Sequence, residues 1–286
     1  MLLFNLSNKK LRSNICLPLF LNLHIFSKEI FIKYEGELMK IAVCVNHVPD
    51  TEARIKIGSD GKTIDKTGIT FILNPYDEIA VEQGLRLREK FGGEVVAISL
   101  GSDSNKETLR KALAMGVDKA IHIKDETQRD SFAVAKALSD VLKELNPDII
   151  LLGKQSIDYD NSQMPGLVGE LLGLPSVSVV VMLQIENSKV ICEREIEGGH
   201  EKVETHLPAV ISVQKGLCEP RYPSLKGIMA SKSKPIEEKK ATDVTAKVEV
   251  ISFRLPPAKQ AGKIVGNDVT AAKELVRLLH EEAKII

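Results

Sequence analysis

The side chains best suited to chemistry lie in one polar loop, residues 153–163, which follows a short apolar run. The loop opens with a glycine, which lets the backbone approach a ligand, and continues with Lys154, which can meet a phosphate. Amide and carboxylate groups at Gln155 and Asp158 can hydrogen-bond a base or a ribose. A helix that opens near residues 160–163 would offer free N–H donors to an anion. The loop therefore indicates nucleotide binding, although it matches neither GxGxxG nor GxxxxGK[ST].

The same residue types also have plain structural roles. Asp158 and Asp160 suit a helix cap as well as a ribose ligand, and we expect His47 to hydrogen-bond within its loop rather than to act as a base. Local spacing suggests no Ser–His–Asp or Cys–His arrangement, although partners distant in the sequence stay open. We expect binding without bond-making chemistry and name no catalytic residue.

Alternating apolar and amphipathic segments predict the scaffold that presents this loop. Short, nearly continuous apolar runs are typical of strands buried on both faces of a parallel sheet covered by helices. Ligands bind at the carboxyl ends of such strands, where residues 45–50 and 100–102 form two further loops. The expected fold class is therefore α/β, with a doubly wound, mostly parallel, Rossmann-like sheet. The expected strands are Ile41–Val45, Val95–Leu100, Ala120–Ile123 and Ile149–Leu152; the expected helices run from Pro75, capped by Asn74, to about Lys90, and over Thr108–Met115 and Ser131–Leu145.

The pattern changes after Pro175, where short apolar runs are joined by turns and predict a β extension. Residues 235–246 are charged and poor in apolar residues, so we expect an exposed linker. A helix from Val269 to about Ala283 carries an apolar face that we expect to pack on a partner. The predicted strands of the extension are Val177–Ile185, Lys189–Ile196, Lys202–His206 and Ala209–Val213.

Composition narrows the classes of partner. The chain carries 39 basic and 39 acidic residues, so no global field attracts nucleic acid or an anionic membrane. Its four cysteines lie far apart without a CxxC pair, which argues against zinc, an iron–sulfur cluster or a disulfide framework and suits a reducing compartment. A small molecule or a protein is the expected partner, with no nucleic acid and no membrane insertion.

The first 38 residues differ from the rest. A basic start and the apolar run Ile15 to Phe26 resemble a targeting peptide, but the run is too short to span a membrane and lacks a small-x-small cleavage site. Residues 35–37 can be encoded by a purine-rich stretch that resembles a ribosome-binding site, and Met39 follows. We expect translation to start at Met39 and residues 1–38 to lie outside the fold.

A stiff segment, residues 219–226, follows the β extension. Pro220 and Pro223 fix φ and cannot donate to a sheet, which predicts a rigid surface loop. An apolar side chain held out at Leu225 can fill a pocket on another protein at little ordering cost. The alternative is that Leu225 and the apolar residues after it open a short helix that packs on the body.

Five segments occur in an order that resembles one family: LNPYDEIAVEQGLRLREK, LRKALAMGVDKAIHI, LLGKQSIDYDNSQ, EREIEGG and CEPRYPSLKGIMASKSKPI. From Met39 to the C-terminus, the sequence is similar to electron transfer flavoprotein β subunits. The resemblance implies a heterodimeric electron carrier, not an enzyme, whose α subunit holds most of the redox FAD while this subunit buries an AMP. Such a carrier takes electrons from acyl-CoA dehydrogenases or similar flavoenzymes and passes them to a quinone-linked oxidoreductase. It would act in the cytoplasm of a bacterium or the mitochondrial matrix of a eukaryote.

The resemblance also implies which residues act. Tyr76 would lie near the flavin ring, the loop with Leu225 at its tip would grip the dehydrogenase, and Glu195 would pair with an α-subunit arginine. Residues 39–225 would form the nucleotide-binding domain, and residues 226–286 an arm and helix that pack on the α subunit. The implied cofactor-binding residues are Cys44, Asn74, Pro75, Tyr76, Asp77, Leu100, Gly153, Lys154, Gln155, Ser156, Ile157, Asp158, Tyr159, Asp160, Asn161, Ser162, Gln163 and Met164, and the implied partner-binding residues are Glu195, Arg221, Tyr222, Pro223, Ser224, Leu225, Lys226, Gly227, Ile228 and Met229.

The sequence departs from the family pattern at two places. Residues 162–166 read SQMPG where many AMP-binding members have Asn/Gln-Thr-Gly-Gln, and Thr51 stands where a second aromatic is expected near the flavin. Two alternatives stay open, the first because of these departures and the second because the first half of the chain also suits universal-stress-type domains. One is a bifurcating carrier with a second FAD in place of AMP. The other is a stand-alone universal-stress-like ATP-binding module, which would leave the Leu225 loop and the terminal apolar helix exposed.

Overall fold

A computed structural model describes residues 38–258 and 261–286 of the chain. The expected upstream extension falls on residues outside the described part, apart from Leu38. The described chain forms two compact units, and each is considered by itself. The first comprises residues 38–55 and 66–249, and the second comprises residues 56–65, 250–258 and 261–286.

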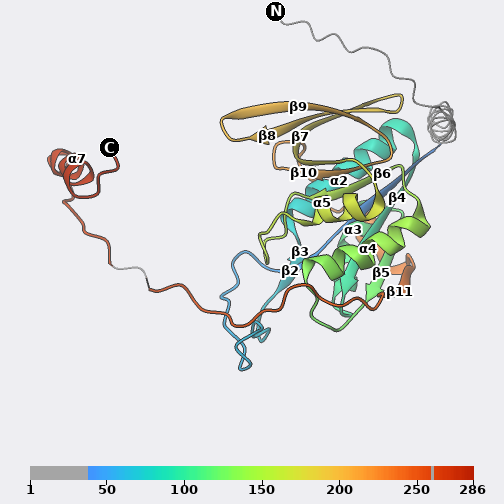
Figure 1. The fold of residues 1–286 in the computed structure, drawn as a ribbon, viewed down its shortest axis with the longest axis horizontal. Coiled ribbons are helices and arrows are strands. Elements are labelled where there is room, and N and C mark those ends of the chain that lie inside the picture. The colour runs from blue at the N-terminus through green and yellow to red at the C-terminus, as the bar shows by residue number, and fades with distance from the viewer. Residues whose placement is uncertain (1–37, 259–260) are drawn as a thin grey trace, which may run out of the picture. The chain divides into compact units, whose positions relative to one another are not determined.

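Among the described residues, nine strands of the first unit form one sheet in the order β11-β5-β4-β1-β6-β10-β7-β8-β9 (Figure 1). Neighbours from β11 to β7 run parallel, and β8 and β9 join antiparallel at one edge. Strand order reverses at β1, which lies between β4 and β6, so a ligand site is expected at their carboxyl ends. The strands are β1 (Met39–Cys44), β4 (Gly93–Gly101), β5 (Lys119–Lys124), β6 (Ile149–Gly153), β7 (Ser176–Glu186), β8 (Lys189–Ile196), β9 (Gly199–His206), β10 (Ala209–Val213) and β11 (Ile236–Lys240).

Helices cover both faces of the sheet, which confirms the doubly wound α/β prediction (Figure 1). Successive residues of a strand face opposite sides, so Ile41 and Val43 of β1 pack with α2 and α3, whereas Ala42 and Cys44 pack with α4 and α5. The helices of this unit are α2 (Pro75–Phe91), α3 (Asn105–Met115), α4 (Ser131–Leu145), α5 (Met164–Leu172) and α6 (Leu225–Ser233).

The linker expected over residues 235–246 is wrong in part, because β11 forms there and pairs with β5 along its whole length. Charged side chains are typical of an edge strand, where they face solvent and discourage pairing with other chains. Composition therefore indicated exposure correctly but could not reveal the backbone pairing. The sequence also gave no sign of the short antiparallel pair β2 (His47–Pro49) and β3 (Phe71–Leu73).

The second unit contains α7 (Ala271–Glu281), the amphipathic helix expected at the C-terminus. Leu278 is buried, while Leu275 and Val276 are exposed. Its packing on another subunit stays a prediction, as does the functional division at residue 226. No helix in the described ranges is both long and apolar enough to cross a bilayer.

Candidate functional site

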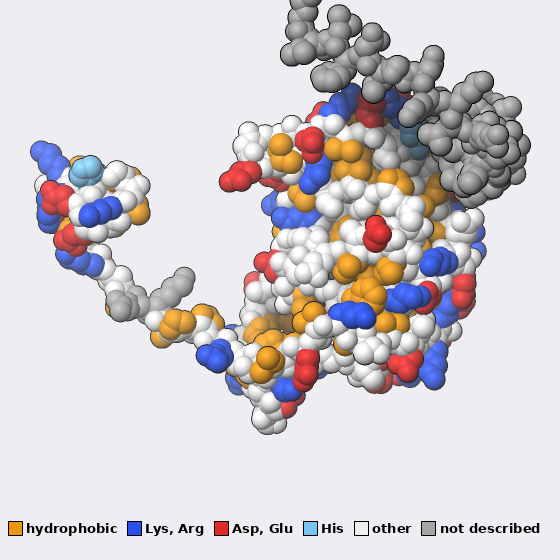
Figure 2. Space-filling model, viewed as in Figure 1, with side chains coloured by type: hydrophobic (Ala, Val, Ile, Leu, Met, Phe, Trp, Pro, Cys, Tyr) orange, Lys and Arg blue, Asp and Glu red, His pale blue; other side chains and the backbone are white. Residues whose placement is uncertain are grey.

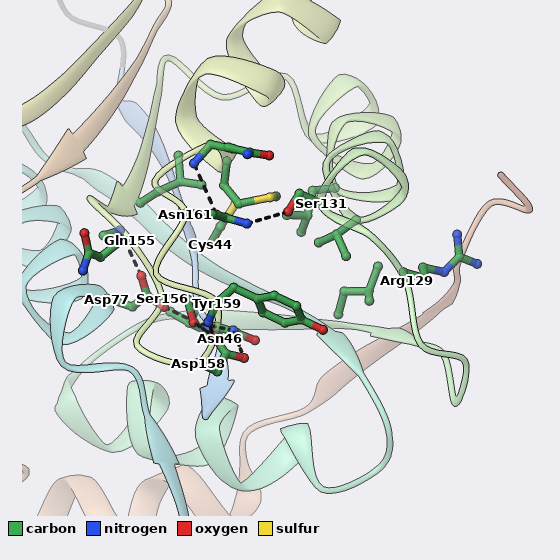
Figure 3. Close-up of a pocket in the computed structure, with 18 of the residues that line it drawn as sticks. Cys44, Asn46, Asp77, Arg129, Ser131, Gln155, Ser156, Asp158, Tyr159 and Asn161 are labelled. Atoms are coloured by element: carbon green, nitrogen blue, oxygen red, sulfur yellow. Dashed lines mark hydrogen bonds between the residues drawn. The ribbon is translucent and has the colours of Figure 1, made fainter. Parts of the chain in front are cut away.

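A cavity of about 270 Å³ lies at the carboxyl ends of β1, β4 and β6, where the strand order reverses (Figure 3). Part of its wall is apolar and comes from the three strands and α4, through Cys44, Leu100, Val134, Leu138 and Leu152. The polar part comes mainly from the loop after β6 and from the segment that leads into α4. An apolar wall with a few placed polar groups is the usual composition of a small-molecule site.

Asp77, on the first turn of α2, ties two strand ends at this cavity. Its Oδ2 accepts from the Asn46 N–H at 2.8 Å, just after β1, and its Oδ1 accepts from the Gly153 N–H at 2.9 Å, at the end of β6. Burial raises the pKa of the Asp77 carboxyl to about 7, against these backbone hydrogen bonds, which lower it. Asp77 lines the cavity as predicted, and both of its oxygens hold the protein's own backbone.

The capping role expected of Asn74 is wrong, and Gly153 has a packing role that the sequence did not predict. Asn74 precedes α2 but makes no side-chain cap; its Nδ2 donates instead to the Gln155 carbonyl at 2.9 Å, and its Oδ1 accepts from the Ile157 N–H at 3.3 Å. At Gly153, a Cβ would lie 2.5 Å from the Asp77 Oδ1 and 2.6 Å from the Tyr76 Cβ. The glycine is therefore required for the close packing of β6 on α2, whatever ligand the cavity takes.

The loop after β6 is held by its own polar side chains and by Asn46, which follows β1. Asn46 Nδ2 donates to Ser156 Oγ at 2.8 Å, Gln155 Nε2 donates to Asp160, and Ser156 Oγ donates to Asp158. Neither aspartate caps α5, which follows Gln163 without a side-chain cap. The alternative that these acids are helix caps is therefore wrong, because their oxygens are taken up within the loop.

The opposite wall of the cavity comes from the start of α4. Ser131 Oγ accepts from Asn161 Nδ2 at 2.9 Å, so the start of α4 and the loop after β6 are in contact along this wall (Figure 3). The Tyr159 ring extends from the loop toward the α4 side and is 54% exposed. Arg129 lines the same wall, with its guanidinium held by Asp125 and by the Thr242 carbonyl. The positive ends of α4 and α5 both lie at this wall, which favours a negative ligand group there.

Most of the residues expected at the cofactor lie on the cavity wall. Those that do are Cys44, Asp77, Leu100, Gly153, Lys154, Gln155, Ser156, Asp158, Tyr159, Asn161, Ser162, Gln163 and Met164. Those outside the wall are Asn74, Pro75, Tyr76, Ile157 and Asp160. Lys154 Nζ lies 5.2 Å from the centre of the Tyr76 ring, so this cation is turned toward α2. Burial raises the pKa of the Cys44 thiol to about 12, which keeps it protonated.

Sequence reasoning missed one part of the wall. The loop before α4 follows the carboxyl end of β5, so the rule that located the other loops could also have located this one. The loops over residues 45–50 and 100–102, which the sequence did identify, also contribute Val45, Asn46 and Gly101. The missed lining residues are Thr127, Gln128 and Arg129 of the loop before α4, Ser131, Val134 and Leu138 of α4, and Leu152 of β6.

The segment around Leu225 combines features of both expectations, and its docking role stays a prediction. Leu225 begins α6, whose N-terminus is capped by Ser224 through the Gly227 N–H at 3.0 Å. The helix packs closely on α3, since a Cβ at Gly227 would lie 2.3 Å from the Ala114 carbonyl oxygen. Leu225 and Tyr222 nevertheless remain 84% and 96% exposed. The short helix thus seats on the body while its first residue stays available.

Two other expected partner residues have contacts within the chain. Arg221 donates to Glu82 and Glu89 of α2, which holds its guanidinium against the body. Glu195, on β8, accepts from Gln214 Nε2 at 3.1 Å. Side chains of both charges are scattered over the face shown in Figure 2, as the balanced composition indicates.

A group of potential metal ligands lies at the sheet edge. Atoms of Asp103, His122 and Glu238 fall within 4.8 Å of one another. The two carboxylates are already neutralised, because Asp103 pairs with Lys106 and Lys124 and Glu238 pairs with Lys106. These ammonium groups would repel a divalent cation, so the group is best described as an ion-pair network.

Comparison with known proteins gives a consistent result. A family model described as "Electron transfer flavoprotein domain" matches residues 62–244. A protein of Syntrophomonas wolfei is 45% identical over 249 residues, which covers 86% of this chain and 98% of that protein. A Bacillus subtilis protein is 40% identical over 259 residues, covering 87% of this chain and all of the relative. Both are named electron transfer flavoprotein subunit beta; an Arabidopsis thaliana relative at 34% identity over 255 residues, covering 87% of this chain and 100% of the relative, bears that name with the word mitochondrial.

Proposed function

Because this chain belongs to the electron transfer flavoprotein β-subunit family, we propose that it works as one half of a heterodimeric electron carrier. In this proposal the α subunit holds most of the redox FAD, and the present chain holds an AMP and a docking segment. Electrons come from acyl-CoA dehydrogenases or similar flavoenzymes and leave to a quinone-linked oxidoreductase. The compartment is the cytoplasm of a bacterium or the mitochondrial matrix of a eukaryote.

The observation that carries the nucleotide proposal is the cavity at the strand-order reversal. Its volume of about 270 Å³ is just below the ~300–1,000 Å³ typical of ligand pockets, which favours a mononucleotide over a dinucleotide such as FAD. The apolar wall near Cys44 and Leu138 suits a planar base. The wall at Ser131 and Asn161 suits a phosphate because two helix N-termini lie there. Asp77 favours the same orientation, since a carboxylate repels a phosphate.

Within this proposal the side chains hold geometry and transfer no proton. The redox chemistry is supplied by the FAD when it is bound. The protonated, buried thiol of Cys44 is inert toward that chemistry. Tyr76, beside Lys154, is proposed to lie near the flavin ring, and Glu195 to pair with an α-subunit arginine that positions the flavin domain.

The docking part of the proposal rests on the exposure of Leu225. An apolar side chain that is 84% exposed at the first position of a capped helix is already ordered, so filling a partner pocket costs little entropy. Tyr222 and Met229, 96% and 67% exposed, enlarge the apolar surface around it. In this proposal the Leu225 side chain fills a pocket of a dehydrogenase-type flavoenzyme.

Nucleotide extraction from the purified heterodimer tests the proposal. The complex is denatured, and the released nucleotides are separated and quantified. One FAD and one AMP per heterodimer are expected. Two FAD would replace the AMP proposal with the bifurcating alternative. ATP bound to this chain purified without an α subunit would contradict the carrier proposal and favour the stand-alone module.

A further inference from the structure

A buried carboxylate lies beneath the exposed docking segment. Glu82, in the middle of α2, has a side chain that is only 3% exposed. Its Oε2 accepts from Arg221 Nε at 2.7 Å and from the Arg221 backbone N–H at 3.2 Å, and its Oε1 accepts from Arg221 Nη2 at 3.1 Å. Oε1 also accepts from Arg86 Nε at 2.7 Å. Three of these four hydrogen bonds therefore come from one residue of the loop.

A buried carboxylate destabilises the fold unless its charge is paired. A buried charge costs several kcal/mol when it lacks a partner, so an ionised Glu82 holds its arginines firmly. Burial pushes the pKa of Glu82 upward, but hydrogen bonds from Arg221 and Arg86 outweigh burial and keep the pKa below its ordinary value. The planar guanidinium of Arg221 also reaches Glu89, where Nη1 meets Oε1 at 2.6 Å, which fixes its orientation as well as its position.

The chain between this ion pair and the docking tip has little freedom. Pro223 restricts φ, Ser224 caps α6, and Leu225 follows as the first helical residue. Beyond the tip, α6 is seated on α3 through the close approach of Gly227 to Ala114. The exposed tip is thus fixed on one side by helix packing and on the other by the Arg221 fork.

We propose that Glu82 is a positioning residue, which sets the exposed Leu225 tip for capture by an apolar pocket of the electron donor. The identity of the donor rests on the proposed function, whereas the ordering of the loop by Glu82 does not. Glu82 itself has no contact with the partner in this proposal, because its side chain is buried beneath Arg221. Its effect is transmitted through Arg221.

The test compares Glu82→Gln with Glu89→Gln in the whole heterodimer. The first change keeps the shape of the side chain but replaces an accepting oxygen with a donor that faces a guanidinium. Cleavage by trypsin at the Lys226–Gly227 bond reports opening of the segment without any partner. We expect about 10-fold faster cleavage for Glu82→Gln, since hydrogen bonds to charged groups are worth more than neutral ones. For Glu89→Gln, which is 50% exposed, we expect less than about 3-fold. An unchanged cleavage rate in Glu82→Gln would overturn the proposal.

Steady-state kinetics of electron transfer from an acyl-CoA dehydrogenase then measure the effect on docking. Glu82→Gln should raise the KM for the carrier about 10-fold and leave kcat unchanged, because only the encounter surface is disordered. If Glu82→Gln does not fold, Arg221→Gln breaks the same contact from the loop side and carries the same expectations. If Glu82→Gln is cleaved faster but neither Glu82→Gln nor Leu225→Ala changes the KM, the ordering by Glu82 stands. That result would contradict the proposed docking function.

Discussion

Two carboxylates on α2 hold the two functional regions by different means. Asp77, at the cavity, is bonded by backbone N–H groups, and burial raises its pKa to about 7. Glu82, beneath the docking segment, is also buried, but Arg221 and Arg86 keep its pKa below the ordinary value. Burial is common to both sites, so the partner decides whether the acid stays charged.

The difference suits the two regions. Backbone donors fix the ends of β1 and β6 where a ligand of limited size would fit. They place no positive charge beside Asp77 that would attract the phosphate away from the N-termini of α4 and α5. The guanidinium fork instead fastens a surface segment to the body across a long sequence separation. One helix thus supports the cavity through Asp77 at its first turn and holds the docking segment through Glu82 at its middle.

Gly153→Ala should strongly destabilise the region around the cavity. The new methyl group would lie 2.5 Å from the Asp77 Oδ1 and 2.8 Å from the backbone carbon of Tyr76, so the tie between β6 and α2 must separate. We expect a loss of about 3 kcal/mol in the free energy of unfolding, as for a severe overpacking of a core. Urea denaturation of the heterodimer measures it.

The matched control is Gly166→Ala on α5, where nothing lies within 4 Å of the new Cβ. Alanine is the better helix former, so a gain of roughly 0.5–1 kcal/mol is expected there. Equal stability of the two alanine variants would show that the packing at Gly153 does not constrain the cavity.

Leu225→Ala should weaken binding to the dehydrogenase with little effect on the stability of the fold. The side chain is 84% exposed, so its removal costs the fold little, but loss of a buried interface anchor costs about 2 kcal/mol of binding, roughly 30-fold in affinity. Transfer kinetics from a dehydrogenase measure the loss, with FAD content as a parallel readout. Leu225→Met keeps an apolar side chain of similar size and should remain close to wild type. An equal loss of FAD in Leu225→Ala would argue against an anchor role.

Asp77 and Glu82 should also differ in how the free energy of unfolding depends on pH. The raised pKa of Asp77 means that the folded chain binds its proton more tightly than the unfolded chain between about pH 4 and pH 7. The contribution of Asp77 to the free energy of unfolding therefore falls as the pH rises through that window, by at most ~1.4 kcal/mol per pH unit, and is constant above it. Asp77→Asn should remove this slope.

For Glu82 the sign is opposite. Its pKa is lowered on folding, so its contribution is present at neutral pH and is lost as the pH falls through the folded-state pKa. Urea titrations of both variants across this range, each subtracted from wild type, give the two slopes. Slopes of the same sign would contradict the prediction that the two carboxylates contribute oppositely to the pH dependence of stability.

Much of the scaffold could be predicted from the sequence because buried parallel strands are almost continuously apolar. The rule that ligands bind at strand carboxyl ends then located the loop over residues 153–163, most of which lines the cavity. The contacts of Asn74 and Asp77 could not be predicted, because a short polar side chain near a helix start can cap the helix or reach another segment, and only the tertiary fold decides. β11 was missed for a related reason, since an edge strand gains its partner from a distant part of the chain.

The bound nucleotide of three heterodimers, wild type, Asp77→Asn and Glu82→Gln, tests the central claim most directly. We predict about one AMP per heterodimer in wild type and in Glu82→Gln after gel filtration, and less than about a tenth of that in Asp77→Asn, which loses one of two backbone ties. AMP missing from wild type, or equal AMP in all three, would contradict a nucleotide cavity organised by Asp77.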